Sequence, residues 1–269
     1  MKGDRARSLL VGTRFADLRW VDQTGSTNQD LLRAAADGAA DGVVLVADHQ
    51  SAGRGRLDRS WVAPDGASLL LSVLVRPAVD LVDAPLLTVA MALAIVDAVA
   101  EFHAQVLVKW PNDVVVDGEP VRKLAGVLAE SMVDRRGSLA VVIGAGINVN
   151  WPTPLPPELE PLAGSATALN LEVGSTVDRV DLLVSLLANL DRRFRAVESG
   201  GPEGPKQLVA MARVASATLG RRVRADLGAR SVVGMASDLD DRGDLVVIDD
   251  AGDRHVVVAG DVIHLRPAP

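Results

Sequence analysis

The segment from His49 to Trp61 holds the residues of this 269-residue chain that are best suited to chemistry. Glycines and arginines alternate there, and a tryptophan closes the segment: Gly53, Arg54, Gly55, Arg56, Arg59 and Trp61. Glycine lets a backbone approach a ligand closely, and guanidinium groups bind anions through paired N–H donors. An isolated Arg-Gly-Arg tripeptide is usually a solvated loop. This one follows a buried apolar run and ends in an aromatic residue that can stack on a planar ring or anchor the core, which favours an anion-binding loop.

A second segment, Lys109-Trp110-Pro111-Asn112-Asp113, follows a short apolar run. Proline restricts the residue before it to extended conformations, and Asn-Asp favours a turn. A lone lysine is usually a surface charge, and Asn-Asp is usually only a turn. A lysine held by a tryptophan and a proline-fixed turn is a more specific signal of function. We therefore expect the Lys109 side chain to be held in a fixed direction at the rim of a sheet.

Two further segments, Lys123–Glu130 and Gly144–Val149, complete the set. The second is similar to a dinucleotide-binding fingerprint, but Val149 replaces the third glycine and no helical pattern follows, which excludes that fold. We expect a Gly-Ala-Gly turn that lets a ligand approach the backbone, with the amide of Asn148 able to pair with an adenine edge.

The elements that must position these residues are strands and helices in mixed order. Residues 19–21 predict a strand that ends in a polar loop, and Thr27 with Asp30 predicts a capping-box variant at the start of a helix that ends at Gly38. Ser26, Thr27 and Asn28 would then lie at a helix N-terminus. Residues 43–47 predict a buried strand that leads into a long polar loop over residues 48–60.

Periodicity and turn signals predict further elements. We expect strands at 68–75, 106–108, 123–130 and 139–143, a hairpin over 114–121 and helices over 85–102 and 177–197. Five prolines between residues 151 and 161 predict an exposed loop, a candidate lid. The fold class is therefore α+β, with a mixed β-sheet sandwiched by helices.

After a further helical stretch beyond Pro202, short strands predict a small C-terminal β-barrel. They fall at residues 222–225, 231–236, 245–248 and 255–259. We place the domain boundary so that residues 1–217 form the larger domain and residues 218–269 the barrel.

Composition excludes several classes of function. The chain has no cysteine, so it has neither a disulfide nor a thiol nucleophile, and its four histidines are far apart, so we expect no structural metal. A formal net charge of -7 argues against nucleic acid as a partner. The N-terminus lacks the apolar core of a secretory signal, and no apolar stretch reaches the roughly 20 residues of a membrane span. The sequence predicts a soluble, cytoplasmic protein.

Five motifs in this order resemble those of the biotin protein ligases, in the form without an N-terminal DNA-binding domain. They are Gly25-Ser26-Thr27-Asn28, Gln50 with the Gly53–Trp61 loop, Lys109–Asp113, Lys123–Glu130 and Gly144–Asn148. The resemblance covers nearly the whole chain and implies that the C-terminal barrel is SH3-like. It implies an enzyme that forms biotinyl-5′-AMP from biotin and ATP and then transfers biotin to a lysine of a biotin carboxyl carrier domain.

The resemblance also implies roles for individual residues. Biotin would be bound by Ser26, Thr27, Asn28, Gln50, Arg54, Gly55, Arg56, Lys109 and Gly126. ATP and the adenylate would be bound by Arg54, Arg56, Arg59, Trp61, Lys109, Asn112, Lys123 and Asn148. Lys109, Arg56 and Arg54 would be catalytic, neutralising the two anions that must meet. Mg²⁺ would accompany ATP, with Asp113 as its possible protein ligand.

The chain departs from the family pattern in two places, and other functions remain open. Leu57-Asp58 stands where the family usually has Arg-Gly, and the hairpin before Lys123 is slightly longer than usual. A lipoate ligase is the enzymatic alternative, whereas an octanoyl transferase would need a cysteine. A biotin-sensing repressor would need a helix-turn-helix domain, for which about twenty residues before the first strand are too few. A biotin-binding protein without catalysis is disfavoured by the lysine and arginines.

Overall fold

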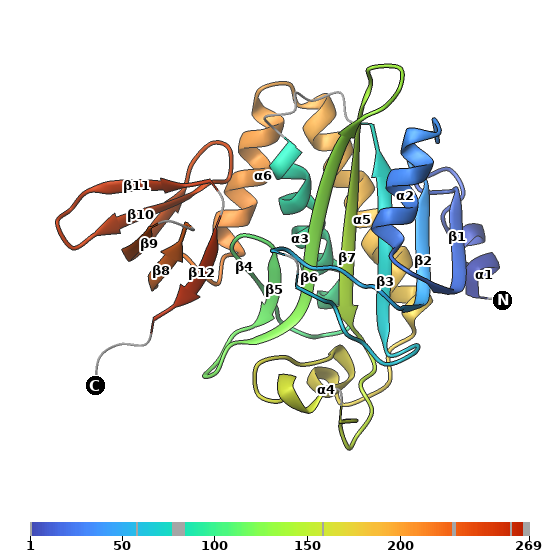
Figure 1. Ribbon diagram of the computed structural model, residues 1–269, viewed down its shortest axis with the longest axis horizontal. Helices are drawn as coiled ribbons and strands as arrows, with labels where there is room; N and C mark the ends of the chain where they lie inside the picture. The colour runs from blue at the N-terminus through green and yellow to red at the C-terminus, as the bar shows by residue number, and fades with distance from the viewer. Residues whose placement is uncertain are drawn as a thin grey trace.

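The computed structural model describes residues 2–57, 59–76, 84–157, 159–227, 230–258 and 260–265. Two β-sheets organise them, a large one with helices on both faces and a small C-terminal one beside it (Figure 1).

The large sheet has seven strands in the order β1-β2-β3-β7-β6-β5-β4. β1 and β2 are parallel, and every other neighbouring pair is antiparallel. The strands are β1 (Leu18–Thr24), β2 (Val44–Gln50), β3 (Ser68–Val75), β4 (Leu107–Lys109), β5 (Asp113–Val116), β6 (Arg122–Val133) and β7 (Leu139–Asn148). The predicted mixed sheet is confirmed.

Helices cover both faces of this sheet, as predicted. The larger core lies on the face covered by α3 (Ala84–Ala100) and α5 (Arg179–Ser199), and the smaller lies under α2 (Thr27–Ala36), which crosses the opposite face (Figure 1). α3 is apolar all round because it is enclosed between the sheet and α5. α5 buries one leucine-rich side, and its first turn is capped by the Asp178 carboxylate, which accepts from two backbone N–H groups. The remaining helices are α1 (Lys2–Leu9), α4 (Leu169–Val173), α6 (Glu203–Val214) and the 3₁₀ turn Glu160–Leu162.

Two local predictions are wrong. α2 begins after Ser26 with no side-chain cap, and the Asp30 carboxylate accepts from the Thr24 hydroxyl instead, so there is no capping box. Residues 144–146 lie inside β7 and form no turn. The proline-rich segment is largely exposed, as predicted, although Trp151 and Leu159 are buried in a small apolar cluster.

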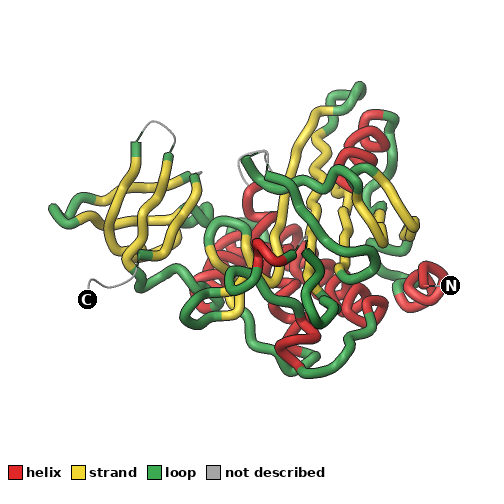
Figure 2. Tube along the Cα trace, turned by 60° about the horizontal axis from the view of Figure 1, so that its bottom comes forward, coloured by secondary structure: helices red, strands yellow, loops and turns green. Residues whose placement is uncertain are grey.

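The C-terminal sheet has five antiparallel strands in the order β11-β10-β9-β8-β12. They are β8 (Arg222–Asp226), β9 (Ser231–Leu239), β10 (Leu245–Asp249), β11 (Arg254–Val257) and β12 (Asp261–His264). Among the residues described, β11 and β12 do not pair with each other, so the predicted barrel is seen as a curved antiparallel sheet (Figure 2).

Residues 215–217 connect the two sheets along the edge strand β4. The Val108 N–H donates to the Ala215 carbonyl at 2.7 Å, and the Ala217 N–H donates to the Val108 carbonyl at 2.8 Å. The edge of the large sheet is thus covered by the segment that leads into the small one. In the described ranges, no helix is long and apolar enough to cross a membrane.

Candidate functional site

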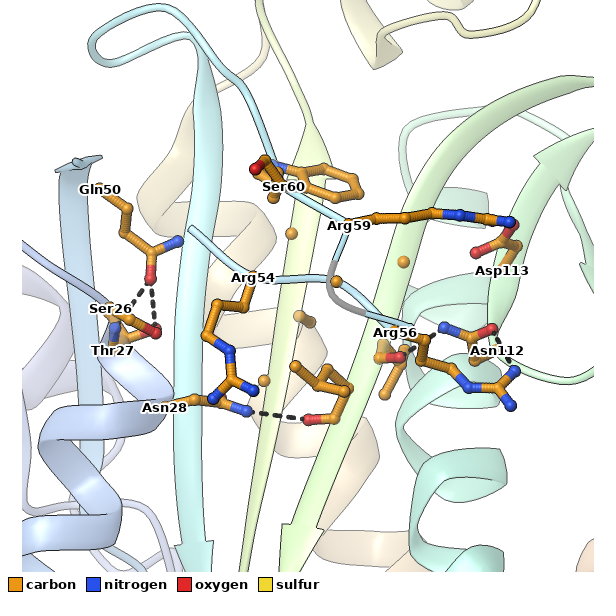
Figure 3. Close-up of a pocket in the computed structure, with 18 of the residues that line it drawn as sticks. Ser26, Thr27, Asn28, Gln50, Arg54, Arg56, Arg59, Ser60, Asn112 and Asp113 are labelled. Atoms are coloured by element: carbon orange, nitrogen blue, oxygen red, sulfur yellow. Dashed lines mark hydrogen bonds between the residues drawn. The ribbon is translucent and has the colours of Figure 1, made fainter. Parts of the chain in front are cut away.

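A cavity of about 140 Å³ opens on the α2 side of the large sheet, between the start of that helix and the Arg-Gly loop (Figure 3). It is lined by Ser26–Asn28, Gln50, residues of the loop from Arg54 to Trp61, Leu71, Asn112 with Asp113, and residues of the paired strands β6 and β7. The loop is itself ordered by backbone pairing, because Arg54 forms a bridge with Ser60 and the Gly55 N–H donates to Arg59 at 2.7 Å. Leu57 turns this loop with a positive φ of 54°, a conformation uncommon for a residue with a side chain.

One end of the cavity is built from uncharged polar groups. The Gln50 carboxamide oxygen accepts from the Thr27 N–H at 2.8 Å and from the Thr27 hydroxyl at 3.1 Å (Figure 3). It thereby satisfies a free N–H at the start of α2, the role that a side-chain cap normally fills. Ser26, whose side chain makes no capping bond, is available to a ligand.

Two residues absent from the sequence-based prediction, Ser72 and Glu130, hold this polar end in place. The Ser72 hydroxyl lies 2.6 Å from the Asn28 amide oxygen and 2.7 Å from the Thr27 hydroxyl. The Asn28 amide nitrogen donates to Glu130 at 2.9 Å, and Arg54 donates to the other oxygen of Glu130 at 3.1 Å. A polar residue inside the otherwise apolar strand 68–75 was the available signal for Ser72.

Glycines form the floor of the cavity. A Cβ at Gly144 would lie 2.2 Å from the Asn28 amide oxygen, and a Cβ at Gly146 would lie 2.5 Å from the Trp61 ring. Gly126 pairs directly with Gly146 across β6 and β7, so the indole lies over two glycines. We expected a ligand to approach the backbone closely at these glycines. The structure shows such an approach, but it is made by the protein's own Asn28 and Trp61 side chains.

The opposite end of the cavity is cationic. Arg56 donates to the Asn112 side-chain oxygen at 3.3 Å (Figure 3). The Lys123 ammonium lies 2.7 Å from the Asp113 carboxylate. Lys123 is also 5.4 Å from the centre of the Trp61 ring, within the range of a cation–π contact. The indole N–H of Trp61 is buried without a hydrogen-bond partner in the described structure. Such a donor calls for a ligand acceptor or a water.

Lys109 is not among the residues that line this cavity, although it pairs across β4 and β5 with Asp113, which does line it. It ends the edge strand β4 close to His264 of the C-terminal sheet, where its charge helps to lower the pKa of that histidine. The neighbouring Trp110 is buried against the same sheet. The ammonium group that meets Arg54 and Arg56 around the cavity belongs to Lys123.

Asn148 is also outside the cavity lining. It is buried, and its amide nitrogen donates to the Thr167 carbonyl at 2.9 Å. No described residue of the proline-rich segment lines the cavity, so the structure gives it no position as a lid. The remaining predicted residues are brought together: Ser26, Thr27, Asn28, Gln50, Arg54, Gly55, Arg56, Arg59, Trp61, Asn112, Asp113, Lys123 and Gly126.

The described residues contain no cluster of three acidic or histidine side chains able to hold a metal ion alone. Asp113 is the carboxylate in the cavity lining, and Lys123 neutralises it. A divalent ion that arrives with phosphate groups needs only one or two protein carboxylates. These donors therefore suit a divalent ion that is bound together with phosphate groups. They do not suit an ion that the protein holds alone.

The cavity thus joins an uncharged hydrogen-bonding end to a cationic end across a glycine floor. Hydroxyl and carboxamide groups at one end can pair with a neutral polar ring. Fixed guanidinium and ammonium groups at the other can bring together two anions that repel each other in water. Such a site suits the activation of a carboxylic acid by a nucleotide.

Comparison with known families agrees with this geometry. The model of the Biotin/lipoate A/B protein ligase family matches residues 20–148, and that of the Biotin protein ligase C terminal domain matches residues 218–265. These ranges contain the cavity and the C-terminal sheet respectively.

Individual relatives match over most of their length. The chain is 44% identical to the biotin--[acetyl-CoA-carboxylase] ligase of Mycobacterium tuberculosis, over 97% of this chain and 94% of the relative. It is 33% identical to the ligase of the same name from Paracoccus denitrificans, over 89% and 97%. A solved structure of the biotin protein ligase from Aquifex aeolicus in complex with biotin and ATP superposes with a TM-score of 0.77 at 26% identity, covering 94% of this chain and 100% of the other.

Proposed function

Because the chain belongs to the biotin protein ligase family, we propose that it activates biotin with ATP and transfers it to a lysine of a biotin carboxyl carrier domain. Residues 1–217 would form the catalytic domain and residues 218–269 the C-terminal domain. The observation that carries the proposal is one cavity with neutral hydrogen-bonding groups at one end and Arg56 and Lys123 at the other.

The uncharged end would bind the ureido ring of biotin. Ser26 and Thr27 offer hydroxyl groups, and Gln50, which is already bonded to Thr27, fixes their orientation. A site that pairs buried polar groups with a substrate rejects analogues that lack those groups, because its own donors and acceptors are then left unpaired. Asn28 takes part indirectly, since its amide already bonds within the protein.

The cationic end would carry out adenylation. An oxygen of the biotin carboxylate attacks the α-phosphorus of ATP, a new P–O bond forms, and the P–O bond to pyrophosphate breaks. Arg54, Arg56 and Lys123 would offset the repulsion between the two anions and the charge that spreads over the phosphoryl oxygens. Trp61 would stack on the adenine, with its unpaired indole N–H as a donor to the nucleotide. One amide N–H of Asn148 is bonded to Thr167, so its second N–H and its amide oxygen would be the groups offered to the adenine.

Mg²⁺ would enter with ATP and neutralise the departing pyrophosphate. Asp113 is the protein carboxylate placed to share it. In the second step the amine of the carrier lysine attacks the biotinyl carbonyl, a C–N bond forms, the C–O bond to AMP breaks, and the amine loses a proton. No enzyme nucleophile takes part, in keeping with a chain that has no cysteine.

One incubation tests the proposal. The protein is mixed with biotin, Mg²⁺-ATP and a biotin carboxyl carrier domain, and the carrier is weighed by intact-mass spectrometry. We expect the mass to increase by one biotinyl group, and no increase when the acceptor lysine is replaced by arginine. Modification by lipoate in place of biotin, or no modification, would overturn the assignment.

A further inference from the structure

The Lys109–Asp113 motif has a part that the cavity does not explain. Lys109 and Trp110 lie outside the cavity, whereas Asn112 and Asp113 line it. The motif therefore runs from the boundary with the C-terminal sheet into the site within five residues.

Trp110 is held by the C-terminal part of the chain at two points. Its backbone N–H donates to the Thr218 hydroxyl at 3.0 Å, and its indole N–H donates to the Gly243 carbonyl at 3.0 Å. Thr218 is fully buried and Trp110 is nearly so. Directed hydrogen bonds between buried groups fix both the position and the rotation of the tryptophan.

The residues that follow Trp110 orient the cations of the site. The Asn112 side chain accepts from Arg56 at 3.3 Å and donates to the Val127 carbonyl at 2.7 Å. Asp113 pairs with Lys123 at 2.7 Å. Pro111 joins Trp110 to Asn112, and its φ is fixed. A displacement of Trp110 would therefore move Asn112 and Asp113 as well.

The space beside Trp110 is open. A second cavity of about 410 Å³ lies between the turn Arg242–Asp244 and β6, and Trp110, Asn112 and Arg56 also line it. Among the described hydrogen bonds of residues 110–113, only those of Trp110 reach the C-terminal sheet. Trp110 therefore links that part of the chain to the site through both its backbone N–H and its indole N–H.

We infer that Trp110 is a positioning residue, through which Thr218, in the segment before β8, and Gly243, in the turn between β9 and β10, hold Asn112 and Asp113 where they orient Arg56 and Lys123. The inference rests on the proposed function, because it concerns the adenylation step. It assigns the C-terminal sheet a role in the chemistry that does not require contact with a substrate.

The test separates positioning from simple support of the interface. Thr218→Val removes the acceptor for the Trp110 N–H with little change in shape, Thr218→Ser keeps that acceptor, and Trp110→Phe removes the indole N–H. The matched control is Arg221→Ala, which breaks the ion pair between Arg221 and Asp117, another contact between the two parts of the chain. Pyrophosphate release with biotin and ATP gives kcat and the KM for biotin, and thermal melting gives stability.

We expect Thr218→Val and Trp110→Phe to lower kcat for adenylation about tenfold or more, because misplacement by about 1 Å can cost up to ~10²-fold in rate. The KM for biotin should stay within about twofold, since Ser26, Thr27 and Gln50 lie on other elements. Thr218→Ser and Arg221→Ala should keep the wild-type rate.

Wild-type rates in both Thr218→Val and Trp110→Phe would overturn the inference, as would an equal loss of rate in Arg221→Ala. If Thr218→Val does not fold, Trp110→Phe decides alone. A wild-type protein that releases no biotin-dependent pyrophosphate would instead contradict the proposed function.

Discussion

Lys109 and Lys123 belong to neighbouring motifs, but of the two only Lys123 lines the cavity. Lys123 reaches the cavity because β6 contains an irregularity: Val114 pairs with Ala125, but Val115 pairs with Lys123. Side chains alternate between the faces of a strand, so the extra residue turns Lys123 to the same side as Gly126. The Lys123 ammonium would lie 3.0 Å from a Cβ placed at Gly126.

The sequence could not reveal the irregular pairing between β5 and β6. The residue types of the site were predictable, since twelve of the fourteen predicted biotin and adenylate residues line the cavity. The face to which Lys123 points was not predictable, because it depends on the shift of pairing between β5 and β6. A bulge of one residue in a short hairpin leaves no reliable mark in composition or periodicity.

We predict that the two lysines differ sharply in function. Lys123→Ala should lower the adenylation rate by ~10²–10³, the usual cost of losing one preorganised charge that stabilises a transition state. Lys109→Ala should lower that rate less, because Lys109 is not among the residues that line the cavity, although it pairs with Asp113 across β4 and β5. Pyrophosphate release in the absence of carrier measures both. An equal or larger loss in Lys109→Ala would contradict the assignment.

At the scale of elements, β7 shows how a strand can serve as the floor of a site. Gly144 and Gly146 are two residues apart and therefore face the same side, where Asn28 and Trp61 lie on them. Glycine inside a strand often marks the close approach of another group, and here that group is a side chain of the protein. The strand was predicted only to residue 143 because the glycines suggested a turn, although the pattern of a buried strand continues to Asn148.

We predict that Gly146→Ala displaces Trp61 and weakens nucleotide binding. The added methyl group would lie 2.5 Å from the indole, too close for the ring to keep its place. The affinity for ATP should fall, and biotinyl-5′-AMP should dissociate faster, as measured by calorimetry and by chase of labelled adenylate. In a Trp61→Ala background the same substitution should have little further effect, because the ring is absent. Wild-type ATP affinity in Gly146→Ala would refute this account.

At the scale of the whole molecule, the two sheets meet at a boundary that carries charge. His264 of β12 lies 3.2 Å from the Thr218 hydroxyl, and its other ring nitrogen is buried without a partner among the residues described. Burial, together with the nearby charges of Lys109 and Arg221, lowers the pKa of His264 to about 4, and the charge of Asp117 opposes this shift. The separate fold of each sheet was predictable from strand spacing. The boundary between the sheets was not, because it brings Lys109 and Asp117 near His264, which is more than a hundred positions away in the chain.

We predict that this histidine makes the stability of the protein depend on pH between about 6.5 and 4. The free side chain has a pKa of 6.5, so as the pH falls the unfolded chain binds a proton that the folded protein excludes until about pH 4. The stability that depends on neutral His264 is therefore complete above pH 6.5, decreases as the pH falls towards 4, and is lost below it. Carboxylates with a lowered pKa, such as Asp249 and Asp134, act at the acid end of this range and below it, since their ordinary value is 3.8.

Thermal melting between pH 4.5 and 7 measures this dependence. His264→Gln, which cannot be protonated, should flatten the decrease in melting temperature over that interval. The matched control is His103→Asn, which removes an exposed histidine and suits the positive φ of 63° at that position. It should leave the slope unchanged. An unaltered slope in His264→Gln would show that the histidine is protonated in the folded protein, and that the boundary between the sheets tolerates a third positive charge beside Lys109 and Arg221.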